Sequence, residues 1–172
     1  DISRGNLVLV NKYNYLPDNY EIEDLVNMSI KVSFSGKKIK KEVYDAFYNL
    51  SMDARKDDLT ILANSTYRDY NYQAALYKRY KNNKGQNYAD SYAARPGHSE
   101  HQTGLAIDIT CANCKLELSE NFANTVEYQW LKDNAHKFGF IIRYQKEKQN
   151  ITGYDFEPWH LRYVGKEVAE KL

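Results

Sequence analysis

The sequence has few cysteines, few prolines and no long apolar segment. It has two cysteines and three prolines among 172 residues, and no apolar run approaches the roughly 20 residues that span a bilayer. Acidic and basic residues nearly cancel, at a net charge of +1. Because there is no large basic field, nucleic acid is not expected as a partner. No repeat or Pro/Gly/Ser linker divides the chain, so residues 1–172 are expected to form a single domain.

Cys111 and Cys114 form a single C-x-x-C motif. A structural zinc site needs four ligands, and no second cysteine pair supplies the other two. A thioredoxin-like redox pair would stand at the start of a helix, whereas this pair follows an expected strand. Two interpretations stay open: a short-loop disulfide in an exported protein, or two unpaired thiols.

Apolar periodicity predicts helices mixed with short strands. Apolar residues at helical spacing predict helices over 41–55, 72–80 and 126–138, with a terminal helical turn at 166–171. Short apolar or alternating runs predict extended segments at 6–11, 30–34, 37–41, 59–64, 105–110, 140–144 and 161–164. Ser35 and Gly36 would join 30–34 and 37–41 as a hairpin, and 81–97 is expected to be an irregular loop. Since no regular βαβ order appears, the expected class is α+β with a small antiparallel sheet.

The segment from His101 to Asp108 combines an imidazole with a carboxylate. Along 105–110 the aliphatic residues alternate with Asp108, so the strand buries one face and holds the carboxylate toward a cleft. Gly104 permits a tight approach or an unusual backbone angle before the strand. This geometry can bring His101 and Asp108 to one metal ion.

Glu157 and His160 lie three positions apart near the C-terminus. In a regular strand that spacing places two side chains on opposite faces, so a bulge or kink near Pro158 is needed to bring them together. With such a bulge, His160 completes the ligand set and Glu157 is left as a general base.

Two imidazoles, one carboxylate ligand and one further carboxylate are typical of a catalytic zinc site, in which three protein ligands leave a position open. This inventory points to a zinc hydrolase. Taken singly, each residue has a structural alternative. A lone histidine such as His160 is more often a semi-buried residue with its hydrogen bonds satisfied, and a lone aspartate in a strand is more often a hydrogen-bonded structural group.

The pattern S-x-H-x6-D followed by E-x-W-H resembles that of the VanY-type D-alanyl-D-alanine carboxypeptidases, within the wider lysostaphin-type and hedgehog-like zinc fold. The similar segments are RPGHSEHQTGLAID at 95–108, FGFIIRY at 138–144, TGY at 152–154 and EPWHLRYVG at 157–165. The openings LVNK, LP and DLV, at 9–12, 16–17 and 24–26, are also similar. The resemblance covers nearly the whole chain and implies one α+β domain with a zinc site in a cleft.

Carried over position by position, the resemblance implies zinc on His101, Asp108 and His160, with Glu157 as the catalytic base. YRD at 67–69, followed by Gln73, matches a family segment in which serine is commoner than Asp69. The resemblance then implies that Arg68 and Gln73 face the substrate and that Arg68 assists catalysis. Ser99 and Tyr144 match positions that contact substrate in carboxypeptidase members. The plain alternative is that Arg68 pairs with Asp69 or another surface acid and that Tyr144 packs.

The resemblance implies a zinc D,D-carboxypeptidase that removes the terminal D-Ala from peptidoglycan stem peptides or their precursors, outside the bacterial membrane. Three alternatives stay open: an L,D-carboxypeptidase acting on the tetrapeptide stem, a cell-wall endopeptidase, and a hedgehog-like module that binds zinc without turnover. Because the sequence begins at Asp1 without Met or a signal peptide, a mature or trimmed chain is expected. Membrane attachment is expected only through a possible removed N-terminal anchor.

Overall fold

A four-stranded antiparallel sheet forms the centre of the computed structural model, which describes residues 2–172. The strands are β1 (Leu25–Asn27), β2 (Lys38–Lys40), β3 (Ile61–Ser65), β4 (Ala106–Cys111), β5 (Phe140–Tyr144) and β6 (Glu157–Tyr163). The α-helices are α1 (Lys41–Lys56), α2 (Tyr70–Lys84), α3 (Gln86–Tyr92), α4 (Val126–Asn134), α5 (Gln149–Thr152) and α6 (Lys166–Ala169). The 3-10 helices are η1 (Ile2–Leu7), η2 (Glu100–Thr103), η3 (Ala112–Cys114), η4 (Glu120–Asn124), η5 (Ala135–Phe138) and η6 (Lys146–Lys148). The predicted α+β class is confirmed.

The large sheet has the strand order β3-β4-β6-β5, and β1 pairs with β2 in a separate two-stranded sheet. In the β4–β6 pair, Asp108 lies directly opposite His160. Between β5 and β6, Ile142 faces Leu161 and Tyr144 faces Glu157, so β6 advances four residues while β5 advances two. The predicted irregularity near Pro158 is therefore a bulge in β6.

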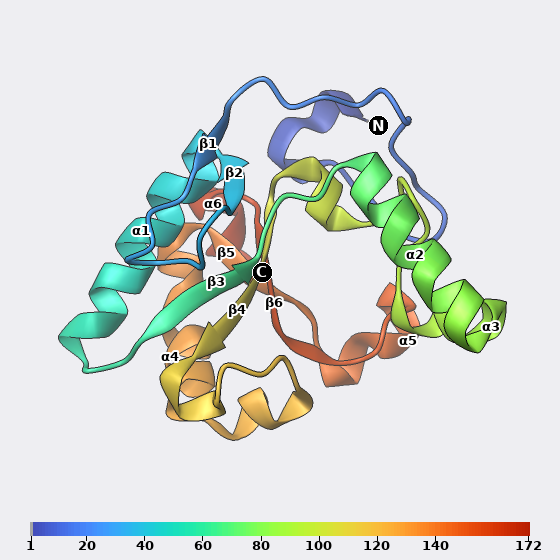
Figure 1. Ribbon diagram of the computed structural model, residues 1–172. Coiled ribbons are helices and arrows are strands. Elements are labelled where there is room, and N and C mark those ends of the chain that lie inside the picture. Colours follow the sequence, from blue (N-terminus) through green and yellow to red (C-terminus); the bar gives the residue numbers. More distant parts are fainter. Residues whose placement is uncertain (1) are drawn as a thin grey trace.

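The core lies between the sheet and the helices α1, α4 and η5. Val43, Phe47 and Leu50 recur on one side of α1 and are fully buried, as expected for an amphipathic helix. The Phe47 ring meets that of Phe140 on β5 edge to face, with 6.2 Å between centroids. Figure 1 shows α1 and α4 on one side of the strands, while α2 and α3 stand apart on the other.

The expectation of a helix over 41–55 is confirmed, and those over 72–80 and 126–138 are confirmed with different ends. The predicted loop over 81–97 was wrong, because α2 continues to Lys84 and α3 follows it directly. Gly85 (φ 87°) separates the two helices. Their only buried side chains are Gln73 and Ala89, so they show no apolar stripe from which α3 could have been predicted.

The N-terminal half differs from the prediction in two places. The first arm of the hairpin is β1 and not 30–34, although the turn at Ser35 and Gly36 is present. The segment 6–11 joins no sheet, even though Val8 and Val10 are buried. The Asn6 and Val8 carbonyls accept hydrogen bonds from Arg162 at 3.0 and 2.7 Å. A buried side chain takes the place of a neighbouring strand.

Two further features bear on the sequence predictions. Cys111 and Cys114 form a disulfide at the end of β4, so the two thiols are paired. Within residues 2–172, no helix has the length and apolar character needed to cross a membrane.

Gly104 joins η2 to β4 in a left-handed conformation (φ 68°, ψ 17°). An added Cβ would lie 2.8 Å from Ile22 Cδ1 and 2.8 Å from Lys40 Cγ. We expect Gly104→Ala to lower the free energy of unfolding by about 1 to 2 kcal/mol from backbone strain alone, and by more from these contacts. Gly153→Ala is the matched control, because Gly153 has φ 73° and an added Cβ would meet only Lys12 Cδ, at an ordinary contact distance of 4.0 Å. Equal losses in denaturant unfolding would show that the contacts of Gly104 are tolerated.

Candidate functional site

His101 lies in η2 with one ring nitrogen in a hydrogen bond and the other facing the Asp108 carboxylate. The Ser99 hydroxyl caps η2 by accepting a hydrogen bond from the His101 amide at 3.3 Å. His101 Nδ1 donates to the Thr66 carbonyl at 2.7 Å. Its Nε2 is buried and has no hydrogen-bond partner among the described residues. Burial and the nearby Arg68 charge lower the pKa of His101, which keeps Nε2 unprotonated and available as a ligand.

Asp108 bridges the two histidines. Its Oδ2 lies 3.2 Å from His101 Nε2, and its Oδ1 lies 3.0 Å from His160 Nδ1. One donor atom from each of the three residues lies within 4.8 Å of the others, and all three residues are buried. Although burial opposes ionisation, the two histidines hold the pKa of Asp108 well below its usual range. Burial also opposes charging of His160, but hydrogen bonds to Asp108 and Glu100 raise its pKa to about 10.

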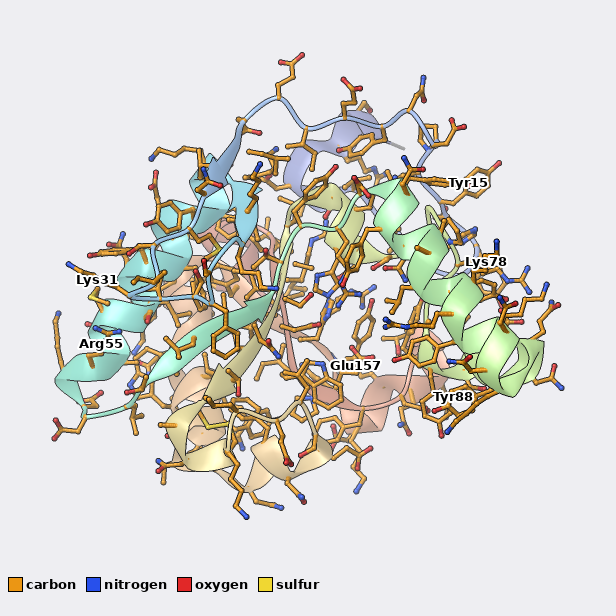
Figure 2. All side chains as sticks on the ribbon, viewed as in Figure 1. Tyr15, Lys31, Arg55, Lys78, Tyr88 and Glu157 are labelled. Atoms are coloured by element: carbon orange, nitrogen blue, oxygen red, sulfur yellow. A yellow bond between two sulfur atoms is a disulfide. The ribbon has the colours of Figure 1, made fainter. Side chains whose placement is uncertain are left out.

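Glu157 stands beside this group at the start of β6, where the bulge brings its Oε2 to 3.7 Å from His160 Nδ1. Its side chain is 31% exposed, whereas those of His101, Asp108 and His160 are at most 7% exposed. Figure 2 shows Glu157 near the middle of the molecule, while Tyr15, Lys78 and Tyr88 lie at its periphery. Burial raises the pKa of Glu157 to about 7, a value suited to exchanging a proton near neutral pH.

Arg68 is fixed on three sides. Its Nη2 lies 3.3 Å from Asp108 Oδ2, and its Nε and Nη1 donate to Ser65 Oγ (3.0 Å) and Gln73 Oε1 (3.4 Å). Gln73 is 1% exposed, and its amide nitrogen donates to the Ala94 carbonyl at 2.8 Å. Gln73 is thus itself fixed, and it holds the Arg68 guanidinium in place. Asp69 caps α2 by accepting from the Tyr72 amide, a role that serine also performs.

Tyr144 forms one wall of the site. Its ring centroid lies 4.8 Å from that of His160 and 4.9 Å from that of Tyr154. The side chain is nearly buried, and burial raises its pKa.

The structure thus gathers the predicted residues around one point, with Gln73 one contact further out. These residues are Arg68, Ser99, His101, Asp108, Tyr144, Glu157 and His160. Their individual roles stay predictions.

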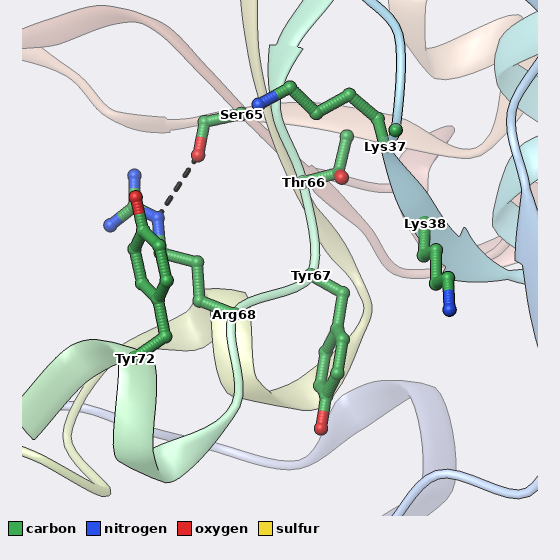
Figure 3. Close-up of a pocket in the computed structure, with 8 residues that line it drawn as sticks. Lys37, Lys38, Ser65, Thr66, Tyr67, Arg68 and Tyr72 are labelled. Carbon is green, nitrogen blue, oxygen red and sulfur yellow. Dashed lines mark hydrogen bonds between the residues drawn. The ribbon is translucent and has the colours of Figure 1, made fainter.

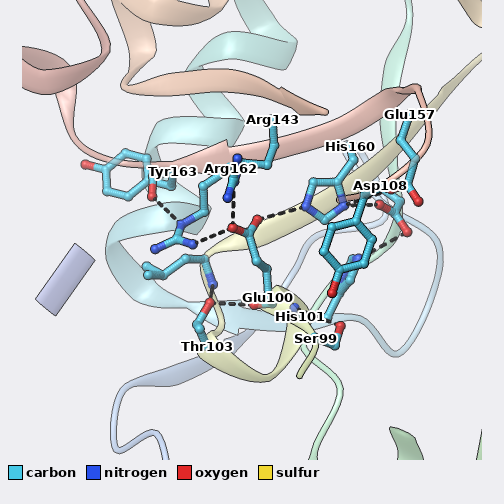
Figure 4. Close-up of polar contacts among 12 residues, drawn as sticks. Ser99, Glu100, His101, Thr103, Asp108, Arg143, Glu157, His160, Arg162 and Tyr163 are labelled. Carbon is cyan, nitrogen blue, oxygen red and sulfur yellow. Dashed lines mark hydrogen bonds and ion pairs between the residues drawn. The ribbon is translucent and has the colours of Figure 1, made fainter. Parts of the chain in front are cut away.

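Sequence reasoning gave no role to Glu100, which is the most buried acid at the site. Its side chain is 1% exposed and contacts His160, Arg143 and Arg162 (Figure 4). Arg162 is itself only 4% exposed. Two arginines placed in apolar strands, at FIIRY and HLRY, were the available indication, because buried arginines require a buried acid.

A pocket of about 250 Å³ lies beside Arg68 (Figure 3). It is lined by Gly36, Lys37, Lys38, Ser65, Thr66, Tyr67, Arg68 and Tyr72. The pocket lies where the loop at residues 35–37 passes the edge of β3, between the hydrogen bonds Phe34 N to Ala63 O and Tyr67 N to Lys38 O. Its lining has three cationic side chains and no acid, so it favours an anion.

The three central residues fit a divalent metal ion. An unpartnered imidazole nitrogen, a second imidazole and an ionised carboxylate converge from two remote segments. Two imidazoles with one carboxylate form a common ligand set for zinc, and each imidazole has its second nitrogen anchored, to Thr66 and to Glu100, as metal-ligating histidines usually do.

The model of the VanY family, described as D-alanyl-D-alanine carboxypeptidase, matches residues 36–166. The chain belongs to this family. YodJ of Bacillus subtilis is 46% identical over 170 residues, which cover 96% of this chain and 62% of YodJ. The chain therefore spans about three-fifths of that curated relative.

Two solved structures are similar over almost all of this VanY-family chain. The first is the LD-carboxypeptidase LdcB, whose structure reveals how that enzyme recognises peptidoglycan. It superposes with a TM-score of 0.92 at 45% identity, and the match covers 98% of this chain and 80% of LdcB. A mutant of the vancomycin resistance D,D-pentapeptidase VanY in complex with Zn(II) gives 0.79 at 33% identity, covering 96% and 92%. The expected fold and family are confirmed.

Proposed function

We propose that this protein is a zinc-dependent carboxypeptidase that releases the C-terminal D-Ala of peptidoglycan stem peptides. The observation that carries the proposal is the convergence of His101, Asp108 and His160, with Glu157 beside them. Zinc is favoured because the donor set suits it and because the related VanY structure holds Zn(II).

Zinc, when bound, supplies the Lewis acidity that activates water and polarises a carbonyl group. The chain's own residues then move the proton. Glu157, which is more exposed than the ligands, takes a proton from the attacking water at its carboxylate and returns it to the departing amine. Tyr144 and the buried strands limit the access of bulk water.

Arg68 would bind the terminal carboxylate that a carboxypeptidase must recognise. Its guanidinium is held rigidly by Ser65 and Gln73, and a fixed cation is well suited to orient a carboxylate. Lys37 and Lys38 line the adjoining pocket and extend the positive region beyond Arg68.

The favoured substrate is the tetrapeptide stem, cut by L,D-carboxypeptidase activity. Similarity to LdcB supports this choice, because it exceeds the similarity to the D,D-enzyme VanY in both identity and superposition. The second candidate is D,D-carboxypeptidase activity on the pentapeptide stem, the activity expected from the sequence. The family description supports it. Both candidate substrates are parts of peptidoglycan, and we propose that the protein acts on them outside the bacterial membrane.

Glu157→Gln should lower kcat/KM by about 10² to 10⁴, because it removes the general base. Zinc content should stay the same, since Glu157 is not a proposed ligand. Chelation should abolish release of D-Ala, and added zinc should restore it. Glu147→Gln, at an exposed acid in η6, is the control and should retain activity. Unchanged kcat/KM in Glu157→Gln, or turnover that survives chelation, contradicts this mechanism. Stoichiometric zinc without any hydrolysis would favour a binding module.

Arg68→Gln should lower kcat/KM by about 10² to 10³ on a peptide with a free C-terminus, because it removes a fixed cation from the site. Amidation of the peptide's C-terminus should lower the wild-type kcat/KM as well. The two changes together should cost little more than either alone, since both remove one interaction. If the two losses are additive, Arg68 interacts with a charge other than the terminal carboxylate. If amidation does not affect cleavage, the activity is that of an endopeptidase.

Tetrapeptide and pentapeptide stems offered separately to the protein should differ in rate. We expect the higher kcat/KM for the tetrapeptide, measured by release of D-Ala. A faster reaction with the pentapeptide would assign D,D-specificity instead.

A further inference from the structure

Glu100 has an unusual position for an acid. It is adjacent to His101 in sequence, yet its carboxylate contacts the other histidine. Oε2 lies 3.1 Å from His160 Nε2, while Oε1 accepts from Arg143 Nε and Arg162 Nη1, each at 2.9 Å. Figure 4 shows Glu100 reaching one edge of the His160 ring, with Asp108 at the other.

The two oxygens of Glu100 have separate partners. An acceptor-only carboxylate at Nε2 requires that nitrogen to carry a proton. Nδ1 also faces an acceptor-only carboxylate, Asp108 Oδ1 at 3.0 Å, but Asp108 is itself part of the group that can hold a metal ion. An ion held there would replace the proton on Nδ1 and leave the proton on Nε2 with Glu100. His101 has the opposite arrangement, because its Nδ1 donates to Thr66 and its Nε2 is unpartnered. The two rings therefore direct different nitrogens to the same point.

We propose that Glu100 is a positioning residue that holds the proton of His160 on Nε2 and orients Nδ1 toward the metal position. This inference rests on the proposed zinc site. It assigns a function to a buried acid that neither binds the ion nor touches the substrate.

Both arginines contact Oε1 of Glu100, and Arg162, whose side chain is 4% exposed, is the more deeply buried of the two. Arg162 is anchored in turn by the carbonyls of Asn6, Val8 and Tyr163. The carboxylate therefore cannot swing away from His160 without leaving two cations uncompensated.

The test is the zinc affinity of metal-stripped protein, measured by competition with a chromogenic chelator. Glu100→Gln keeps the shape of the side chain and removes its charge. We expect its zinc affinity to fall about 10- to 100-fold, as for other outer partners of metal-ligating histidines. Arg143→Gln is the matched control, because it removes a partner of Oε1 and leaves the His160 contact intact. Its zinc affinity should stay within about threefold of wild type.

A purely structural ion pair predicts a different result: both variants would lose stability in thermal unfolding, and zinc affinity would be unchanged. That outcome overturns the proposal. If the wild-type chain itself binds no zinc, the proposed function fails and this inference fails with it. Normal wild-type binding with unaltered Glu100→Gln binding contradicts the role of Glu100 alone.

A second measurement uses the wild-type protein, so it does not depend on whether a variant folds. In the zinc-loaded wild-type protein, ¹⁵N NMR of labelled histidine should show His160 protonated at Nε2 and metal-bound at Nδ1. His101 should show the reverse. A His160 proton on Nδ1 would overturn the proposal.

Discussion

The register between β4 and β6 is the constraint on which the site depends. It sets Asp108 directly opposite His160, and directly opposed residues of an antiparallel pair lie close enough to contact each other. A slip of one residue would turn one of the two side chains to the other face of the sheet. The central strands therefore give the metal position their rigidity, and only His101 comes from outside them. Its place is fixed by the Thr66 carbonyl after β3 and by the left-handed turn at Gly104.

Charge alternates through the interior on both sides of this pair. Arg68 contacts Asp108, His160 lies between Asp108 and Glu100, and Glu100 contacts Arg143 and Arg162. Each buried charge thus has an opposite neighbour, which offsets the cost of removing it from water. Buried pairs of this kind add little net stability but fix orientation, and orientation is what a metal site requires. The N-terminal segment takes part as well, because its carbonyls hold Arg162.

The sequence was sufficient to predict a feature where a local residue pattern agrees with what the tertiary structure requires. The α1 helix and the bulge at Pro158 follow from apolar spacing and from the need to bring Glu157 and His160 together, and both are present. The sequence was insufficient where a segment or side chain is buried only because of residues far away in the chain. Val8 and Val10 suggest a strand, yet Arg162 satisfies the carbonyls of that segment. Glu100 reads as an ordinary acid beside a histidine until β5 and β6 bring two arginines to it.

Stereochemical preference has to be sought outside the metal position. The cluster of His101, Asp108, His160 and Glu157 would act on a carbonyl carbon and a water, and neither reports the configuration of the residue before the scissile bond. The chain is accordingly similar over nearly its full length to an LD-carboxypeptidase and to a D,D-pentapeptidase. For the two proposed substrates, the groups around the cluster are the Tyr144–Tyr154 wall and the cationic pocket beside Arg68, and it is to these that we assign the distinction. The proposed chemistry thus depends on side chains from β4, β6 and η2, whereas the proposed selection depends on side chains around them, such as Tyr144 on β5 and Arg68 after β3.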